Sequence, residues 1–246
     1  MHTTFAEVKS TLASGSTVLD IVGDYLKVIH QNSDLNAFLE VFEDSAKAQA
    51  VIVDTKIANK TAGKLAGMVI GLKDNLCYKG HKVSAASKIL EGFESLYTAT
   101  AVQRLIDEDA VIIGRLNCDE FAMGSSNENS AFGPVKNKLN KNFVPGGSSG
   151  GSAVAVSVGM CTAALGSDTG GSIRQPASFT GTYGIKPTYG RISRFGLIAY
   201  ASSFDQIGTF TNSLEDSALL LEVMAGEDEF DSTVSNKPVD KFSDFE

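Results

Sequence analysis

The spacing of apolar residues along the chain predicts helices that alternate with strands. Apolar side chains recur every three or four positions between Val18 and Ile29, which is the period of an amphipathic helix. The same reasoning predicts helices from Asp44 to Asn59 and from Ala101 to Glu108. Two short apolar runs, Met68–Leu72 and Val111–Gly114, are typical of buried strands.

The alternation continues in the second half of the chain. An Ala- and Val-rich run from Ala153 to Val158 predicts a helix that Ser152 opens and Gly159 ends, because serine favours helix starts and glycine favours helix ends. The run Cys161–Leu165 predicts the next strand. Because helices and strands alternate, the sequence predicts an α/β fold with a mainly parallel sheet and helices on its faces.

The segment after this sheet predicts one more helix and then a change of composition. Ser213 to Asp216 has the pattern of a capping box in front of a helix from Ala218 to Ala225. No internal repeat is present, so we expect one domain over residues 1–226. Residues 227–246 are acidic and contain a proline, and we interpret them as a linker-like tail.

Composition is typical of a globular protein of the cytoplasm. Apolar residues make up 43% of the 246 residues and charged residues 20%. There is no run of 18 apolar residues and no basic region followed by an apolar one at the start, so we expect neither a membrane span nor a secretory signal. The three cysteines are far apart, which fits a reducing compartment and predicts no metal or redox motif.

Two glycine-rich stretches carry the most specific information in this chain. Pro145 to Ser152 and Gly166 to Arg174 each set a serine among glycines, and these serines, Ser148 and Ser172, are 24 residues apart. Glycine allows sharp turns and close approach of the backbone to a ligand. A serine in such a turn is accessible, and neighbouring backbone N–H groups can bind an anion.

Several familiar motifs are excluded by what surrounds these serines. Gly146 to Gly150 fits the nucleophile elbow of α/β-hydrolases, which requires a histidine later in the chain, yet all three histidines come earlier. The glycine spacing of a phosphate-binding loop is present, but Ser152 stands where that loop requires lysine. What remains is serine chemistry with a base other than histidine.

Lys73 is a candidate for that base. It follows the apolar run that ends at Leu72, and active-site groups of α/β sheets gather at the ends of strands. Burial would lower the pKa of its amine, and only a neutral amine can accept a proton. Taken alone, Lys73 is more typical of a surface lysine whose stem covers apolar residues.

Three strings of residues resemble the amidase signature family: Gly71 to Asn75, Gly147 to Ser152 and Gly166 to Pro176. The resemblance implies a fold with one mixed, largely parallel sheet and helices on both faces. It implies that Ser172 is the nucleophile, that Ser148 is a bridging serine after a cis peptide bond, and that Lys73 is the base. The backbone N–H groups of Thr169, Gly170, Gly171 and Ser172 are then the expected oxyanion hole.

Three longer strings, Asp119 to Ser125, Gly184 to Leu197 and Ala201 to Gly208, are similar to one branch of that family. Its members are the glutamine-hydrolysing A subunits of glutamyl-tRNA(Gln) amidotransferases. The resemblance implies heterotrimers with B and C subunits, in which ammonia released from glutamine converts Glu-tRNA(Gln) to Gln-tRNA(Gln). ATP and Mg²⁺ are expected at the partner subunit, and no cofactor in this chain.

The net charge of −8 agrees with a chain that releases ammonia and leaves tRNA to a partner subunit. Phosphate contacts require a basic surface, so we expect the B subunit to make most of the contacts with tRNA. A local basic patch on this chain stays an open alternative.

Other residues have less specific roles in the resemblance. Met123, Gly124 and Ser125 match a segment that lines the substrate pocket in relatives. Asp168 is expected to orient the nucleophile loop or the substrate, or simply to cap a turn. Arg174 is interpreted as part of the scaffold around that turn.

Members of the family are much longer than this chain. We therefore expect the chain to be their N-terminal part, with a sheet and a substrate pocket that are incomplete on the C-terminal side. Whether it is active alone stays open. Two alternatives also remain: an amidase that acts on another amide without partners, and a truncated, non-catalytic piece that only assembles with a partner subunit.

Overall fold

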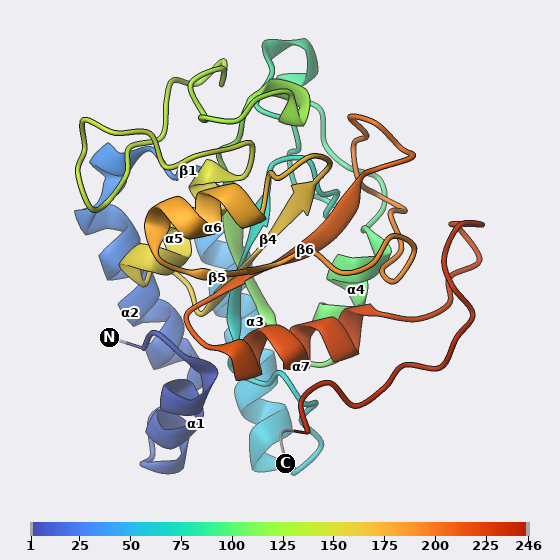
Figure 1. The fold of residues 1–246 in the computed structure, drawn as a ribbon. Coiled ribbons are helices and arrows are strands. Elements are labelled where there is room, and N and C mark those ends of the chain that lie inside the picture. Colours follow the sequence, from blue (N-terminus) through green and yellow to red (C-terminus); the bar gives the residue numbers. More distant parts are fainter. Residues whose placement is uncertain (1, 245–246) are drawn as a thin grey trace.

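A six-stranded sheet runs through the centre of the computed structural model, which describes residues 2–244 (Figure 1). Its strands are β1 (Phe38–Val41), β2 (Val69–Lys73), β3 (Val111–Leu116), β4 (Ala163–Asp168), β5 (Tyr183–Ile185) and β6 (Gln206–Thr211). Their order across the sheet is β1-β3-β2-β4-β6-β5. The two strands that were predicted first, β2 and β3, lie next to each other near the middle.

The predicted mixed sheet is confirmed, but its parallel part is confined to the centre. β3, β2 and β4 run parallel, whereas β1, β6 and β5 join through antiparallel pairs. The reason lies in the connections. The helix α4 lies between β2 and β3 in the chain, as a parallel pair of neighbours requires, while no helix separates the antiparallel neighbours β5 and β6. β2 and β4 therefore both end at the same edge of the sheet.

Helices cover both faces of the sheet. They are α1 (Phe5–Ala13), α2 (Val18–Gln31), α3 (Glu43–Ala58), α4 (Thr100–Asp107), α5 (Gly150–Val158), α6 (Arg174–Thr180) and α7 (Leu214–Met224), with single 3₁₀ turns at Ser33–Leu35, Lys88–Leu90 and Glu120–Ala122. Successive side chains of β6 point to opposite faces of the sheet and contact different helices. Thr209 and Thr211 bond the hydroxyl of Ser217 in α7, whereas Phe210 lies against Gly166 on the side of α5.

The predicted helices before residue 110 are confirmed with small shifts at their ends. α2 buries the apolar positions that predicted it and begins with a capping box, in which the Thr17 hydroxyl and the Asp20 carboxylate each accept a backbone N–H. None of the helices described between residues 2 and 244 combines the length and the apolar character needed to cross a lipid bilayer.

Two predicted helix starts are wrong in detail. α5 begins at Gly150 instead of Ser152, and the Ser152 hydroxyl donates to the carbonyl of Leu165. Glycine is needed there because a Cβ on Gly151 would lie 2.3 Å from the carbonyl oxygen of Asn117. At α7, the Ser213 hydroxyl accepts the N–H of Asp216, but the Asp216 carboxylate accepts the N–H of Phe5. A bond to a distant helix thus replaces half of the predicted capping box.

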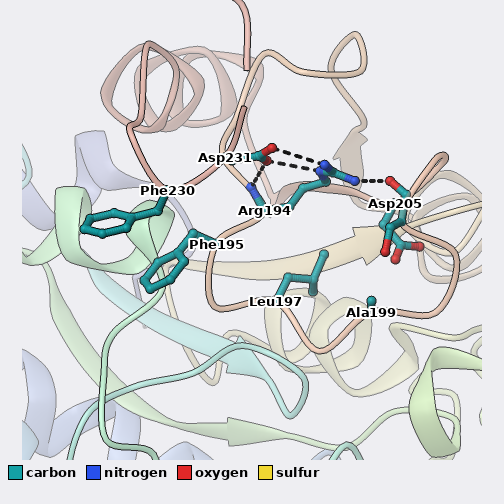
Figure 2. Close-up of a pocket in the computed structure, with 8 residues that line it drawn as sticks. Arg194, Phe195, Leu197, Ala199, Asp205, Phe230 and Asp231 are labelled. Carbon is teal, nitrogen blue, oxygen red and sulfur yellow. Dashed lines mark hydrogen bonds and ion pairs between the residues drawn. The ribbon is translucent and has the colours of Figure 1, made fainter. Parts of the chain in front are cut away.

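The segment after α7 is fixed to the fold by two aspartates. The Arg194 guanidinium donates to both carboxylate oxygens of Asp231, at 3.1 Å each, and also to the carbonyl of Ser202 (Figure 2). Asp228 accepts the hydroxyls of Thr100 and Ser193. These bonds hold the first part of the expected tail against the loop that runs between β5 and β6.

Candidate active site

Lys73 ends β2 inside the molecule. Its side chain is fully buried, and its Nζ lies 2.7 Å from the Ser148 Oγ and 2.9 Å from the Ser167 Oγ. Within residues 2–244 no carboxylate lies within ion-pair distance of this amine. Lys73 is therefore held by two hydroxyls, in a position where its positive charge is poorly stabilised.

This environment lowers the pKa of Lys73. Burial is the main cause, and it brings the pKa from 10.5 to about 8. The acidic groups of Cys118, Asp119, Asp168 and Asp205 act in the opposite direction with smaller effects. Near neutral pH a useful fraction of the amine is uncharged, so Lys73 can accept a proton through its lone pair.

Ser148 lies in a turn whose backbone is fixed from several sides. The peptide bond between Gly147 and Ser148 is cis, as the resemblance predicted. The N–H of Gly147 donates to Oε1 of Gln175 at 2.9 Å, and the carbonyl of Ser148 accepts the N–H of Asp119. A Cβ on Gly147 would lie 2.2 Å from the Asp119 carboxylate, so only glycine fits before Ser148.

The Ser172 loop is organised around the buried carboxylate of Asp168. This carboxylate accepts the N–H of Gly171 at 2.8 Å, the N–H of Ile173 at 3.1 Å, and two bonds from the Arg174 guanidinium at 3.0 Å each. Burial alone would raise the pKa of Asp168, but the bonds from Arg174 and Ile173 lower it overall. Asp168 therefore holds the loop in its ionised form, and Arg174 is part of the scaffold.

One member of the predicted oxyanion hole is used inside the protein. The N–H of Gly171 points at Asp168, so it is not free for a bound anion. The N–H groups of Thr169, Gly170 and Ser172 make no hydrogen bond within residues 2–244. The candidate oxyanion donors are thus three of the four expected groups.

A cavity of about 500 Å³ opens in front of this loop. Its lining contains Met123, Gly124 and Ser125 together with Gly170, Gly171 and Ser172, and it is completed by Ala122, Gly147, Gln175 and Tyr200. Ser172 is 9% exposed, and its hydroxyl makes no hydrogen bond in the described part of the chain. The three weaker substrate-binding candidates therefore line the same cavity as Ser172, whereas the fully buried Asp168 does not reach it.

The predicted triad is brought to one place, although its contacts differ in kind. Lys73 bonds the Ser148 hydroxyl directly. Ser148 is connected to the Ser172 loop through the backbone, because the N–H of Ser149 donates to the carbonyl of Ser172 at 3.3 Å. Lys73 and Ser148 are thus joined by a hydrogen bond, and Ser172 lines the cavity beside them.

Sequence reasoning missed four residues of this region. Ser167 bonds Lys73, Gln175 holds Gly147, and Tyr200 lines the cavity. Asp205 accepts the Thr169 hydroxyl at 2.5 Å and the N–H of Tyr200 at 2.9 Å, so it joins the Ser172 loop to the cavity wall. Ser167, Gln175 and Asp205 lie inside the strings that carry the resemblance, but no spacing rule singles out Tyr200.

Asp205 also borders a second, smaller cavity of about 190 Å³ (Figure 2). Phe195, Leu197 and Phe230 supply its apolar lining, and Arg194 bound to Asp231 forms one wall. The segment after α7 thus lies against a part of the loop that supports the main cavity.

The chain is similar to known proteins in sequence and in fold. The profile of the family described as Amidase matches residues 20–246. The A subunit of glutamyl-tRNA(Gln) amidotransferase from Chlorobium phaeobacteroides is 52% identical, over 99% of this chain and 52% of its own length. The crystal structure of the corresponding A subunit from Thermotoga maritima is 41% identical, with a TM-score of 0.78 over 91% of this chain and 50% of its own.

A third similar protein is the native peptide amidase from Stenotrophomonas maltophilia. It is 33% identical, and its structure matches 94% of this chain and 50% of its own with a TM-score of 0.88. The chain spans about half the length of the curated relatives it matches.

Proposed function

The chain belongs to the amidase family, and on this premise we propose that it hydrolyses glutamine as the A subunit of a tRNA-dependent amidotransferase. The observation that carries the proposal is a fully buried Lys73 bonded to Ser148 beside a cavity that Ser172 lines. The names of the relatives at about 52% identity support the choice of amidotransferase.

The proposed reaction begins with attack by Ser172. The side-chain carboxamide of glutamine lies in the cavity with its carbonyl carbon near the Ser172 Oγ. As the new C–O bond forms, the Ser172 proton passes to the Ser148 Oγ, and the Ser148 proton passes to the neutral amine of Lys73. A lysine whose pKa is about 8 suits this step, because it is a strong enough base and is partly neutral at physiological pH.

The carbonyl oxygen becomes an oxyanion in the tetrahedral intermediate. The free N–H groups of Thr169, Gly170 and Ser172 are the proposed donors to it, and Asp168 keeps their loop in shape. When the C–N bond breaks, the proton returns from Lys73 through Ser148 to the leaving nitrogen, and ammonia departs. Water then attacks the Ser172 ester along the same proton path and releases glutamate.

The use of the ammonia follows from the same proposal. It would pass to a partner B subunit, which activates Glu-tRNA(Gln) with ATP and Mg²⁺ and converts it to Gln-tRNA(Gln). A C subunit would complete the heterotrimer. The chain carries a net charge of −8, which supports a role in producing ammonia and leaves most contacts with tRNA to the partner.

The direct test is ammonia release from glutamine by the chain. We would measure the ammonia and glutamate released by wild type, by Ser172→Ala and by the control Ser157→Ala. Ser157 lies in the last turn of α5, where its hydroxyl donates to the carbonyl of Val154. The proposal expects release by wild type and by the control, and none by Ser172→Ala. A folded wild type that releases no ammonia from glutamine overturns it and favours the non-catalytic assembly piece.

A second candidate is an amidase that acts on other amides without partners. The similarity to peptide amidase, with a TM-score of 0.88, favours it. Competition between glutamine and a peptide with a C-terminal amide separates the two candidates. Faster ammonia release from the peptide amide would replace our proposal with this alternative, while a preference for glutamine supports the amidotransferase role.

A further inference from the structure

Ser167 is a second hydroxyl at the amine of Lys73. It belongs to β4, is almost fully buried, and its Oγ lies 2.9 Å from the Lys73 Nζ. The same oxygen accepts the side-chain N–H of Asn75, also at 2.9 Å. The two contacts place Ser167 between the base and a buried amide, away from the cavity that Ser172 lines.

The geometry of an amine explains why this contact matters. A neutral lysine nitrogen has two N–H groups and one lone pair in a tetrahedral arrangement. If the lone pair is to receive the Ser148 proton, the N–H groups must point elsewhere and need acceptors. Within residues 2–244, Ser167 is the only hydrogen-bond partner of this amine apart from Ser148 itself.

Ser167 also holds the turn that carries Ser148. Its backbone carbonyl accepts the hydroxyl of Ser149 at 3.1 Å, and the N–H of Ser149 in turn bonds the carbonyl of Ser172. One residue of β4 therefore touches the base through its side chain and the bridging turn through its backbone. Asn75 fixes the side chain of Ser167 from the other side.

We propose that Ser167 is a positioning residue, which accepts an N–H of Lys73 so that the amine's lone pair faces Ser148. The inference rests on the function proposed above, since it concerns how Lys73 acts as the base. When Lys73 carries the proton, the ammonium donates to both hydroxyls, and the proton can return to Ser148 without a change of side-chain position.

Loss of the Ser167 hydroxyl has two consequences that can be measured. The amine can rotate away from Ser148, which slows proton transfer. The ammonium also loses an acceptor, so the pKa of Lys73 falls below its wild-type value. The acidic groups that face Lys73, namely Cys118, Asp119, Asp168 and Asp205, remain in place and cannot produce this downward shift.

The experiment follows the phosphonylation of Ser172 by a small fluorophosphonate, measured by intact mass between about pH 6 and pH 10. Wild type would be compared with Ser167→Ala, with Ser167→Thr, which keeps a hydroxyl, and with Ser152→Ala. Ser152 is a matched control, because it is an equally buried serine of the neighbouring helix that bonds Leu165 and does not contact Lys73.

We expect Ser167→Ala to react about 10- to 100-fold more slowly, as misplaced catalytic groups do. The rise of its labelling rate with pH, here called the pH limb, should move to lower pH. Ser167→Thr should restore both rate and limb, and Ser152→Ala should match wild type. If Ser167→Ala fails to fold, Ser167→Cys, a weak acceptor, takes its place.

A slower Ser167→Ala with an unmoved pH limb would reduce Ser167 to a structural residue and overturn the inference. An unchanged rate would also overturn it. Failure of the proposed function gives a different result, because wild type itself would then not be labelled on Ser172.

Discussion

The candidate active site has two sides that are built differently. On the base side, Lys73, Ser148 and Ser167 are buried at the ends of β2 and β4 or in the turn beside them, and their polar atoms bond one another. On the cavity side, Met123 is 51% exposed and Tyr200 is 48% exposed, and the Ser172 hydroxyl is unbonded within residues 2–244.

The difference fits the two requirements of the proposed reaction. The base side needs burial, because burial brings the pKa of Lys73 down to about 8, and the sheet supplies that burial from its most central strands. The cavity side needs open donors and space for a substrate. A buried group of hydrogen-bonded side chains therefore adjoins an open cavity whose lining includes half-exposed side chains.

The largest expected effect is on the base side. Lys73→Met keeps the volume of the side chain and removes the proton acceptor, so we expect the rate of Ser172 acylation to fall about 10²- to 10⁴-fold. The rate of labelling by a fluorophosphonate, followed by intact mass, measures this. A variant that is labelled as fast as wild type would mean that the base lies elsewhere.

A smaller effect is expected where the two sides meet. Asp168→Asn removes one acceptor from the Ser172 loop, so either the N–H of Gly171 or that of Ile173 loses its partner. We expect acylation to slow about 10- to 100-fold, seen in kcat more than in KM. Asp34→Asn, an exposed carboxylate paired with Lys141, is the matched control. Equal rates for both variants would show that Asp168 does not set the loop geometry.

The base side should also lower the stability of the fold. The pKa of Lys73 falls from 10.5 to about 8 on folding, which corresponds to about 3 kcal/mol at neutral pH. Lys73→Met removes the buried charge but also two hydrogen bonds. We therefore expect its free energy of unfolding at pH 7 to be about 1–2 kcal/mol higher than that of wild type.

The free-energy cost of burying the Lys73 charge depends on pH. The unfolded chain binds the Lys73 proton more tightly, so the cost is fully present below pH 8 and disappears as the pH rises towards 10.5. Urea unfolding of both proteins across this range measures it. A Lys73→Met protein that is less stable than wild type at pH 7 would contradict the account.

The smallest effect is expected on the cavity side. Met123→Ala shortens a half-exposed side chain, so the free energy of unfolding should change by less than about 0.5 kcal/mol. Any change in hydrolysis should appear in KM, because Met123 lines the cavity and does not contact Lys73, Ser148 or Ser172 through a hydrogen bond. Steady-state kinetics would test this, and a large loss of kcat would make Met123 part of the chemistry.

The sequence predicts the elements of this fold better than their assembly. The apolar period from Val18 to Ile29 and the run before Lys73 determine a helix and a strand locally, and both are present. The order of the six strands depends on distant pairings, such as β4 with β6, that leave no local pattern. The antiparallel outer strands therefore could not be predicted from periodicity.

The same distinction holds for the site. Lys73, Ser148 and Ser172 stand in strings specific enough to identify by resemblance. The direction of a single N–H group is different, because the Gly171 N–H turns to Asp168 as a result of tertiary geometry. The contacts of Ser167 could not be predicted either, because its hydroxyl meets Lys73 and Asn75 only in the folded chain.

The central claim is that Ser172 is a nucleophile activated by the neutral amine of Lys73. It is tested most directly by peptide mapping of the chain after reaction with a glutamine-analogue acylating agent across a range of pH. The account predicts one adduct, on Ser172, whose rate of formation rises with a midpoint near pH 8. An adduct on another residue, or a rate that does not depend on pH in this range, would contradict it.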